Sequence, residues 1–315
     1  MTSLYQHLRH QYKTGSLSKA AFIKKMHECV HSSLFSYAQH LDQTDISLIE
    51  ISAGRVLMTS RLDGIRIAVD VEDQRTAPIE ILNFGFYEPE ETEVIRRVIA
   101  EKDMDTMLDI GANIGWYSLM ASKLNHNASI HAFEPIPSTY HKLIENCLLN
   151  SSDKLECHNY GFSTEVGSFP FYFYPEGGVN ASMQNLAKRE DAMIIECEVR
   201  PLNSVLQWLP VNSRIDFIKC DVEGNELFVL QGGLDLLKQY KPILLCELLR
   251  KWSASFGYHP NEVIDLLQQL GYKPYTCSST GHLCEFNRIT NKTIQTNFFF
   301  VHPESRLREA ALHRV

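Results

Sequence analysis

The sequence contains no long apolar run. None of its segments approaches the roughly 18 apolar residues that a membrane-spanning helix needs, and the polar first residues lack the apolar core of a secretion signal. Basic residues are also in the minority, with 30 Lys and Arg against 38 Asp and Glu. A net charge of −8 argues against a nucleic-acid backbone as substrate. We therefore expect a cytoplasmic protein with no membrane span and no nucleic-acid partner.

Cysteine pairs at metal-binding spacing are absent as well. The eight cysteines are scattered along the chain, and no two of them form a C-x-x-C motif. This distribution argues against a cysteine-ligated zinc centre and favours reduced thiols. The remaining composition, 44% hydrophobic and 22% charged residues, is typical of a soluble globular protein.

The patterning divides the chain into three regions. Residues 1–45 are expected to form a helical extension, because apolar residues recur at helical spacing on both sides of a break at Gly15. Residues 46–80 contain strand-like runs joined by glycine turns, which indicates a small β-hairpin region. Over residues 81–315 strands and helices alternate, as in a mostly parallel α/β sheet. The helical extension is a candidate contact for a homodimer.

One strand–turn–helix segment, M-L-D-I-G-A-N-I-G-W-Y-S, carries the strongest functional signal. Its apolar strand contains Asp109, and the turn contains Gly111, Asn113 and Gly115. Glycine allows backbone N–H groups to approach a ligand closely, and asparagine tolerates left-handed geometry better than other side chains. The following helix offers unpaired N–H donors at its N-terminus. The alternatives are a nucleotide-type cofactor above the turn and a tight turn without a ligand.

A carboxylate after the next predicted strand favours the cofactor. The short apolar run of residues 128–133 ends at Glu134. In a doubly wound sheet the carboxyl ends of neighbouring strands open onto one crevice. Glu134 can therefore accept hydrogen bonds from both hydroxyls of a ribose. A solvated carboxylate at a strand end is the alternative.

Further acids follow two strand-like runs in the second half of the chain. Asp221, Glu223 and Glu226 come after one run, and Glu247 ends the other. Glu226 is expected to lie in the first turn of the next helix, where a negative charge is favourable. Asp221 and Glu247 are expected at the same edge of the sheet, because both strands end there.

Together these motifs resemble the FkbM-type methyltransferases over about residues 80–302. The motifs that carry the resemblance are L-D-I-G-A-N-I-G-W-Y-S, F-E-P and I-D-F-I-K-C-D-V-E-G-N-E, preceded by F-Y-E-P-E. The resemblance implies an enzyme that uses S-adenosylmethionine (SAM) to methylate hydroxyls of sugars, glycolipids or secondary metabolites. It also implies a class I methyltransferase fold: a Rossmann-like, doubly wound, mostly parallel seven-stranded sheet with an antiparallel last strand, here with the N-terminal extension.

The resemblance further implies roles for single residues. Asp109 would face the methionine amine, Glu134 would hold the ribose, and Asn159 with Gly161 would border the adenine. The implied cofactor contacts are Tyr87, Glu88, Asp109, Gly111, Asn113, Gly115, Glu134, Asn159, Gly161 and Asp221.

Methyl transfer to a hydroxyl needs a group that takes the hydroxyl proton. A side-chain base can do so, or a divalent cation such as Mg²⁺ can lower the pKa of the hydroxyl. Asp221 and Glu247 are the candidate metal ligands, and Glu223 completes an oxygen set that suits Mg²⁺. With His259, a second candidate base, they make up the catalytic candidates. The glycine pair within residues 175–182 predicts a lid loop.

Two other classes stay open at this stage. A nicotinamide-dependent oxidoreductase would share the ribose role of Glu134, but the glycine spacing does not fit the G-x-G-x-x-G fingerprint. A non-catalytic SAM-fold scaffold would bind partners through its N-terminal helices. Because a polar residue is present at every candidate site position, we prefer an enzyme that acts on a small-molecule or glycan hydroxyl. Methylation of nitrogen has the same transfer geometry and stays open.

Overall fold

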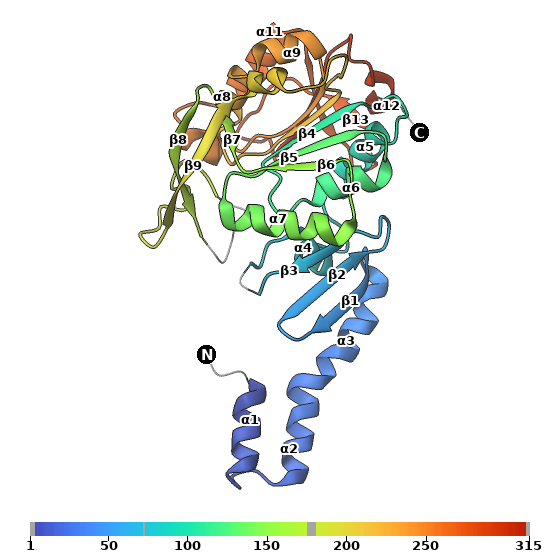
Figure 1. Ribbon diagram of the computed structural model, residues 1–315, viewed down its shortest axis with the longest axis vertical. Coiled ribbons are helices and arrows are strands. Elements are labelled where there is room, and N and C mark those ends of the chain that lie inside the picture. Colours follow the sequence, from blue (N-terminus) through green and yellow to red (C-terminus); the bar gives the residue numbers. More distant parts are fainter. Residues whose placement is uncertain (1–3, 72, 175–180, 313–315) are drawn as a thin grey trace.

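A central eight-stranded sheet organises the molecule (Figure 1). The structure is a computed structural model that describes residues 4–71, 73–174 and 181–312. The sheet has the strand order β13-β12-β14-β11-β10-β4-β5-β6. Its strands are β4 (Thr106–Ile110), β5 (Ser129–Phe133), β6 (Leu155–His158), β10 (Phe217–Cys220), β11 (Ile243–Glu247), β12 (Lys273–Cys277), β13 (Leu283–Glu285) and β14 (Asn297–Val301). The five strands from β6 to β11 run parallel, whereas β14 is antiparallel to both of its neighbours.

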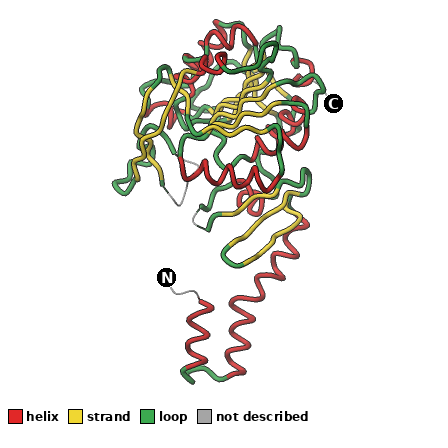
Figure 2. The backbone as a smooth tube through the Cα atoms, viewed as in Figure 1, coloured by secondary structure: helices red, strands yellow, loops and turns green. Residues whose placement is uncertain are grey.

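Helices cover both faces of this sheet (Figure 2). The central strands β4 and β10 are buried along their whole length, as expected for apolar strands between two helical layers. Each face has its own cluster of buried apolar side chains. The helices of the body are α5 (Pro89–Ile99), α6 (Trp116–Leu124), α7 (Pro137–Asn150), α8 (Glu226–Gln231), α9 (Leu234–Tyr240), α10 (Arg250–Ser255), α11 (Asn261–Gln269) and α12 (Arg308–Leu312).

The alternating apolar runs of the sequence correctly predict the parallel core and its antiparallel end. Strands β12 and β14 pair antiparallel, as the polar stretch between them indicates. That stretch also contains β13, which adds an eighth strand at the edge of the expected seven-stranded sheet. A three-residue strand with mixed polarity has no periodicity that would reveal it in the sequence.

A second, three-stranded sheet lies beside the body, with the order β7-β9-β8. It consists of β7 (Gly161–Ser163), β8 (Gly167–Phe173) and β9 (Met193–Pro201). The resemblance implies that residues 160–163 lie at the end of the third strand of the main sheet, and this placement is wrong. The third strand, β6, ends at His158, and Gly161 begins a strand that pairs with β9.

The N-terminal region forms a helical arm and a small sheet. The arm extends away from the body and consists of α1 (Leu4–Lys13), α2 (Lys19–Met26), the π turn His27–His31 and α3 (Ser32–His40) (Figure 1). The small sheet has the order β1-β2-β3 and is followed by α4. These elements are β1 (Ile46–Ser52), β2 (Arg55–Ser60), β3 (Arg66–Val69) and α4 (Ala77–Phe84). The described part of the chain contains no helix with the length and apolarity needed to span a bilayer.

Two asparagines of α7 fasten the small sheet to the body. The Asn146 Oδ1 accepts a hydrogen bond from the Ala68 backbone N–H at 2.9 Å, and the Asn150 Oδ1 accepts one from the Arg66 N–H at 2.9 Å. These side chains satisfy the N–H groups of the edge strand β3, which has no further strand beside it. The small sheet and α4 are thereby held near the crevice at the carboxyl ends of the parallel strands.

Candidate functional site

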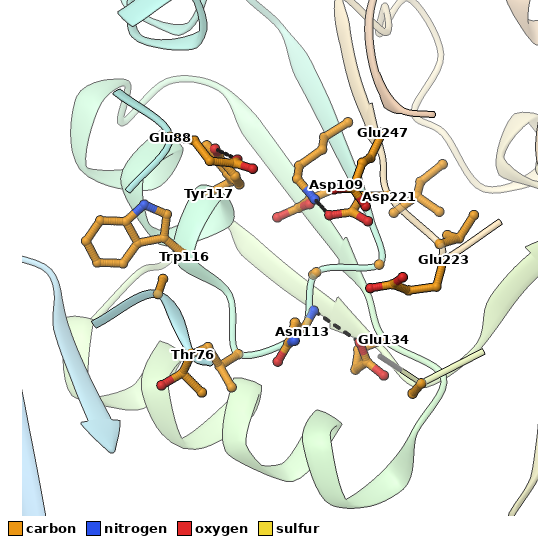
Figure 3. A pocket seen from close by; sticks show the side chains of 18 of the residues that line it. Thr76, Glu88, Asp109, Asn113, Trp116, Tyr117, Glu134, Asp221, Glu223 and Glu247 are labelled. Atoms are coloured by element: carbon orange, nitrogen blue, oxygen red, sulfur yellow. Dashed lines mark hydrogen bonds and ion pairs between the residues drawn. The ribbon is translucent and has the colours of Figure 1, made fainter. Parts of the chain in front are cut away.

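A cavity of about 450 Å³ lies at the carboxyl ends of β4, β5, β10 and β11. Figure 3 shows that side chains from several of these strands point toward it. Residues between Arg75 and Pro89, in the segment that precedes β4 in the chain, also line this cavity. The cavity therefore lies at the position where open α/β sheets bind their ligands.

The glycine turn after β4 is shaped by three left-handed residues. Gly111, Asn113 and Gly115 have φ angles of +78°, +51° and +92°. A Cβ atom on Gly111 would lie 1.8 Å from the Asp221 carbonyl oxygen, so the turn passes directly against the backbone that follows β10. Asn113 adopts the left-handed conformation in place of a glycine, and its Oδ1 is buried without a hydrogen-bond partner among the described residues.

The backbone N–H groups of this turn are already used inside the protein. Those of Gly111 and Ala112 donate to the Phe133 carbonyl at 3.0 Å, and that of Gly115 donates to the Ala112 carbonyl at 2.8 Å. The expectation that the glycine N–H groups meet the ligand therefore does not fit this geometry. The donors left for an anion are those at the start of α6, which begins at Trp116 and leaves its first N–H groups without helical partners.

Asp109 is buried beneath the turn, with 1% of its surface exposed. Its Oδ2 accepts a hydrogen bond from the Ser118 hydroxyl at 2.6 Å, whereas its Oδ1 has no partner within the described chain. Burial raises the pKa of Asp109, and the Lys219 ammonium opposes this rise. An unpartnered buried carboxylate oxygen has a strong requirement for a donor, which a bound amine would satisfy.

Glu134, which follows β5, is hydrogen-bonded to the glycine turn. One of its carboxylate oxygens accepts the Asn113 backbone N–H at 3.1 Å (Figure 3). The other accepts the Ile136 N–H at 2.9 Å. These bonds fix the carboxylate at the cavity and leave further lone pairs on both oxygens. Burial is the main reason why the pKa of Glu134 is raised to about 7.

Three carboxylates gather at the ends of β10 and β11. Oxygens of Asp221, Glu223 and Glu247 lie within 4.8 Å of one another, as the sequence pattern predicts for acids at one edge of a sheet (Figure 3). Burial, followed by the charge of Asp221, raises the pKa of both Glu223 and Glu247 well above the usual value. The Lys219 Nζ donates to the Asp221 Oδ2 at 2.9 Å and is the cation of the cluster.

The lysine of this cluster was not identified from the sequence. Lys219 lies two residues before Asp221, and alternate residues of a strand share one face. Its side chain is only 8% exposed. Although burial alone would lower its pKa, the Asp221 and Asp109 carboxylates raise it overall, so Lys219 stays charged.

Glu88 connects three elements at the edge of the cavity. Its left-handed backbone, with φ of +42°, precedes α5. The Tyr117 hydroxyl of α6 donates to one carboxylate oxygen, and the Asn297 amide of β14 donates to the other at 3.1 Å. The adjacent Tyr87 ring packs against Trp116 with a centroid distance of 6.1 Å. Tyr87, Glu88 and Pro89 of the upstream Y-E-P-E stretch therefore line the cavity.

Two candidate site residues do not lie in the cavity. His259 is exposed, and its Nδ1 accepts the Asn261 backbone N–H at 3.2 Å beside the start of α11. The Asn159 amide donates to the Glu134 and Pro135 carbonyls and so supports the chain after β5, while Gly161 does line the cavity. Neither His259 nor Asn159 therefore contacts this space directly.

The expected lid falls mostly outside the described residues, which omit 175–180. Its last residue, Ser182, is fully buried, and its hydroxyl donates to the Glu223 carbonyl at 2.9 Å. The end of this segment is therefore fixed against the chain that carries one of the clustered carboxylates.

The arrangement fits SAM by the chemistry of its donors and acceptors. The unpartnered oxygens of Asp109 and Asn113 suit an amine, the start of α6 suits a carboxylate, and Glu134 suits a ribose diol. The fold is that of a class I SAM-dependent methyltransferase. A sequence model of the methyltransferase FkbM domain matches residues 109–274, more than half of the chain. The protein therefore belongs to the FkbM methyltransferase family, and its cofactor is SAM.

Several characterised relatives carry the methyltransferase name. The chain is 31% identical over 196 residues to methyltransferase sdnD of Sordaria araneosa, covering 53% of this chain and 73% of that protein. It is 28% identical over 180 residues to the hexuronic acid methyltransferase AglP of Haloferax volcanii, covering 57% and 68%. A match to methyltransferase 1 of Beauveria bassiana has 29% identity and spans only 59% of that protein.

Solved structures include the crystal structure of methyltransferase FkbM from Methylobacillus flagellatus. It is 17% identical, with a TM-score of 0.40, and the match covers 63% of this chain and 44% of that one.

Substitution of Glu134 by Gln is expected to weaken cofactor binding in a pH-dependent way. Ionised Glu134 would accept hydrogen bonds from both ribose hydroxyls, whereas the protonated acid or an amide would offer one donor there. Because the pKa of Glu134 is about 7, the affinity of the wild type for S-adenosylhomocysteine should fall as the pH decreases from 8 to 6. Glu134→Gln should bind about 10-fold more weakly at pH 8, a loss of about 1.4 kcal/mol, and lose this pH dependence.

Calorimetric titration with S-adenosylhomocysteine at both pH values provides the measurement. Glu165→Gln makes the same chemical change at an exposed position away from the cavity and serves as the control. Equal affinities of wild type and Glu134→Gln at pH 8 would exclude the ribose role.

Proposed function

We propose that this methyltransferase methylates a hydroxyl oxygen on a sugar, a glycolipid or a secondary metabolite. The carboxylate cluster of Asp221, Glu223 and Glu247 is the observation that supports transfer to oxygen. A hydroxyl holds its proton tightly, so the acceptor oxygen needs a base in the transition state. Carboxylates with a raised pKa are stronger bases than ordinary ones, and both Glu223 and Glu247 are of this kind.

The residues of the site would divide the reaction between them. SAM, when bound, supplies a methyl group that its sulfonium already activates. The acceptor oxygen forms a bond to the methyl carbon while the carbon–sulfur bond breaks and its electron pair stays on sulfur. We assign the hydroxyl proton to Glu247, which ends β11 at the cavity. Lys219 would hold Asp221 in place, and the buried wall would align the acceptor behind the methyl group.

A Mg²⁺-assisted reaction is the second candidate, because Asp221, Glu223 and Glu247 offer three oxygen ligands within 4.8 Å. The Lys219 ammonium disfavours it, since it already pairs with Asp221 at 2.9 Å and would repel a divalent cation. We therefore prefer the general base.

The wall opposite the carboxylates favours a sugar-like acceptor. Phe84 and Phe86 line the cavity with 75% and 50% of their surfaces exposed. Aromatic surfaces of this kind can pack against the CH groups of a sugar ring. Arg75 also lines the cavity, where its charge opposes the rise that burial causes in the pKa of Glu223, and a guanidinium suits a carboxylate of the acceptor. The similarity to a hexuronic acid methyltransferase agrees with an acidic sugar.

Turnover of a panel of uronic acids, neutral glycosides, amino sugars and small alcohols with SAM tests this proposal. Product analysis by mass spectrometry and NMR identifies the methylated atom, and parallel reactions with EDTA or Mg²⁺ test for metal dependence. We expect methyl ether formation that EDTA does not abolish. Exclusive N-methylation, or no turnover of any hydroxyl by protein that binds S-adenosylhomocysteine, would contradict the proposal.

Substitution of Arg75 by Ala is expected to raise the KM for an acidic acceptor by about 10-fold, the effect of losing about 1.4 kcal/mol of binding. The KM for a neutral acceptor should change little, because such an acceptor has no carboxylate for the guanidinium to bind. Initial-rate kinetics with a matched pair of acidic and neutral sugars provides the measurement. Arg288→Ala, at an exposed pair with Asp265, is the control. Equal effects on both acceptors would argue against a carboxylate contact.

A further inference from the structure

A second cluster of potential metal ligands lies outside the cavity, on the edge strand β6 and its neighbour β5. His131 of β5 lies in register with Glu156 of β6, and His158 lies two residues farther along the same strand. Side chains at alternating positions share one face of a strand, so all three lie on the same face of the sheet. The other face is covered by α7, whose Cys147 contacts Cys157.

The spacing of the three side chains fits a transition-metal ion. The His131 Nδ1 lies 3.2 Å from the His158 Nε2 and 3.8 Å from the Glu156 carboxylate. Two nitrogens bound to a tetrahedral Zn²⁺ at about 2.0–2.1 Å lie roughly 3.3 Å from each other. The two imidazoles therefore already have the separation that a shared ion needs, and a small rotation of the exposed Glu156 would bring its oxygen into range.

The surroundings fix the two rings but leave the third ligand accessible. Trp208 packs against His131 at a centroid distance of 4.7 Å and against His158 at 5.5 Å, and Phe133 stacks on His158 at 4.6 Å. The His131 side chain is 6% exposed, whereas that of Glu156 is 69% exposed. Water can therefore complete the coordination on the side of Glu156.

We propose that His131, Glu156 and His158 form a binding site for a divalent transition-metal ion such as Zn²⁺. Imidazole nitrogen favours such ions over Mg²⁺, which prefers an all-oxygen set. A bound ion would link β5 to β6. The residues that directly follow these two strands lie at the cofactor cavity. Its role is to stabilise this edge of the sheet. The site does not depend on the proposed acceptor chemistry.

Calorimetric titration of the 315-residue chain, without a tag and after EDTA treatment, tests the site. We expect one Zn²⁺ per chain with an affinity that Glu156→Ala weakens at least 10-fold, while His158→Gln abolishes the tight phase. Because Glu156 is exposed, its substitution should leave the fold intact. The chain has 13 histidines, so His141→Gln, at an exposed position of α7, controls for weak binding elsewhere.

Two further measurements separate a metal site from a hydrogen-bonded histidine pair. Zn²⁺ should raise the melting temperature of the wild type but not of Glu156→Ala, and Mg²⁺ should have no such effect through these residues. Co²⁺ should give a visible spectrum with nitrogen ligands, which His158→Gln loses. Zn²⁺ titrations of Glu156→Ala and His158→Gln that match the wild type would overturn the proposal.

Discussion

Glu247→Gln is expected to lower kcat for methyl transfer by about 10²–10⁴-fold, the usual effect of losing a general base. Glutamine has nearly the same shape as glutamate but cannot take the hydroxyl proton. Burial, and then the charge of Asp221, raises the pKa of Glu247 well above its usual value. The ionised form is the base, so wild-type activity should increase with pH as Glu247 loses its proton. The variant should lack this increase.

Initial rates across the pH range, with the acceptor found in the turnover panel, measure both effects. The affinity for S-adenosylhomocysteine shows whether the cavity is intact, and it should change far less than kcat. Glu285→Gln makes the same substitution on the exposed strand β13 and should behave as the wild type. A kcat of Glu247→Gln close to that of the wild type would refute the assignment of the base. Loss of wild-type activity in EDTA, restored by Mg²⁺, would instead make Glu247 a metal ligand.

Short sequence patterns correctly predicted those features that depend on interactions within a few residues of the chain. The strand–turn–helix pattern predicted a left-handed turn at Asn113, and the structure has φ of +51° there. Glu226 was expected in the first turn of a helix, and α8 begins at this residue. Its carboxylate accepts the Val222 and Gly224 backbone N–H groups, both at 3.1 Å. Such interactions span only a few residues, so their geometry follows from sequence spacing.

The rest of the site depends on contacts between distant parts of the chain. Glu88 receives a hydrogen bond from Asn297, a residue 209 positions away. No sequence pattern predicts this contact, because only the folded arrangement brings the start of α5 close to β14. The second sheet, β7-β9-β8, is a similar case, because the sequence pattern of neither β7 nor β9 indicates that these two strands pair. His259 was a candidate base from its residue type and its position after the fifth strand, and neither gives its distance from the cavity.

Gly111→Ala is expected to destabilise the protein and to abolish detectable binding of S-adenosylhomocysteine. The left-handed backbone at φ of +78° costs an alanine roughly 1–2 kcal/mol. The new Cβ would lie 1.8 Å from the Asp221 carbonyl oxygen, so the backbone itself must move. Overpacking of this kind costs roughly 1–3 kcal/mol more. The displaced segment bears Asp221 and lies beside the glycine turn, so the cofactor site changes together with stability.

Thermal unfolding and calorimetry with S-adenosylhomocysteine measure the two consequences, and a decrease in melting temperature of roughly 5–15 °C is expected. Gly257→Ala separates strain from the clash. Gly257 has a similar φ of +81°, but a Cβ there would meet nothing within 4 Å. It should therefore lose only about 1 kcal/mol and retain full cofactor affinity. If Gly111→Ala were no less stable than Gly257→Ala and bound the cofactor equally well, the close approach of the turn to Asp221 would not determine the shape of the site.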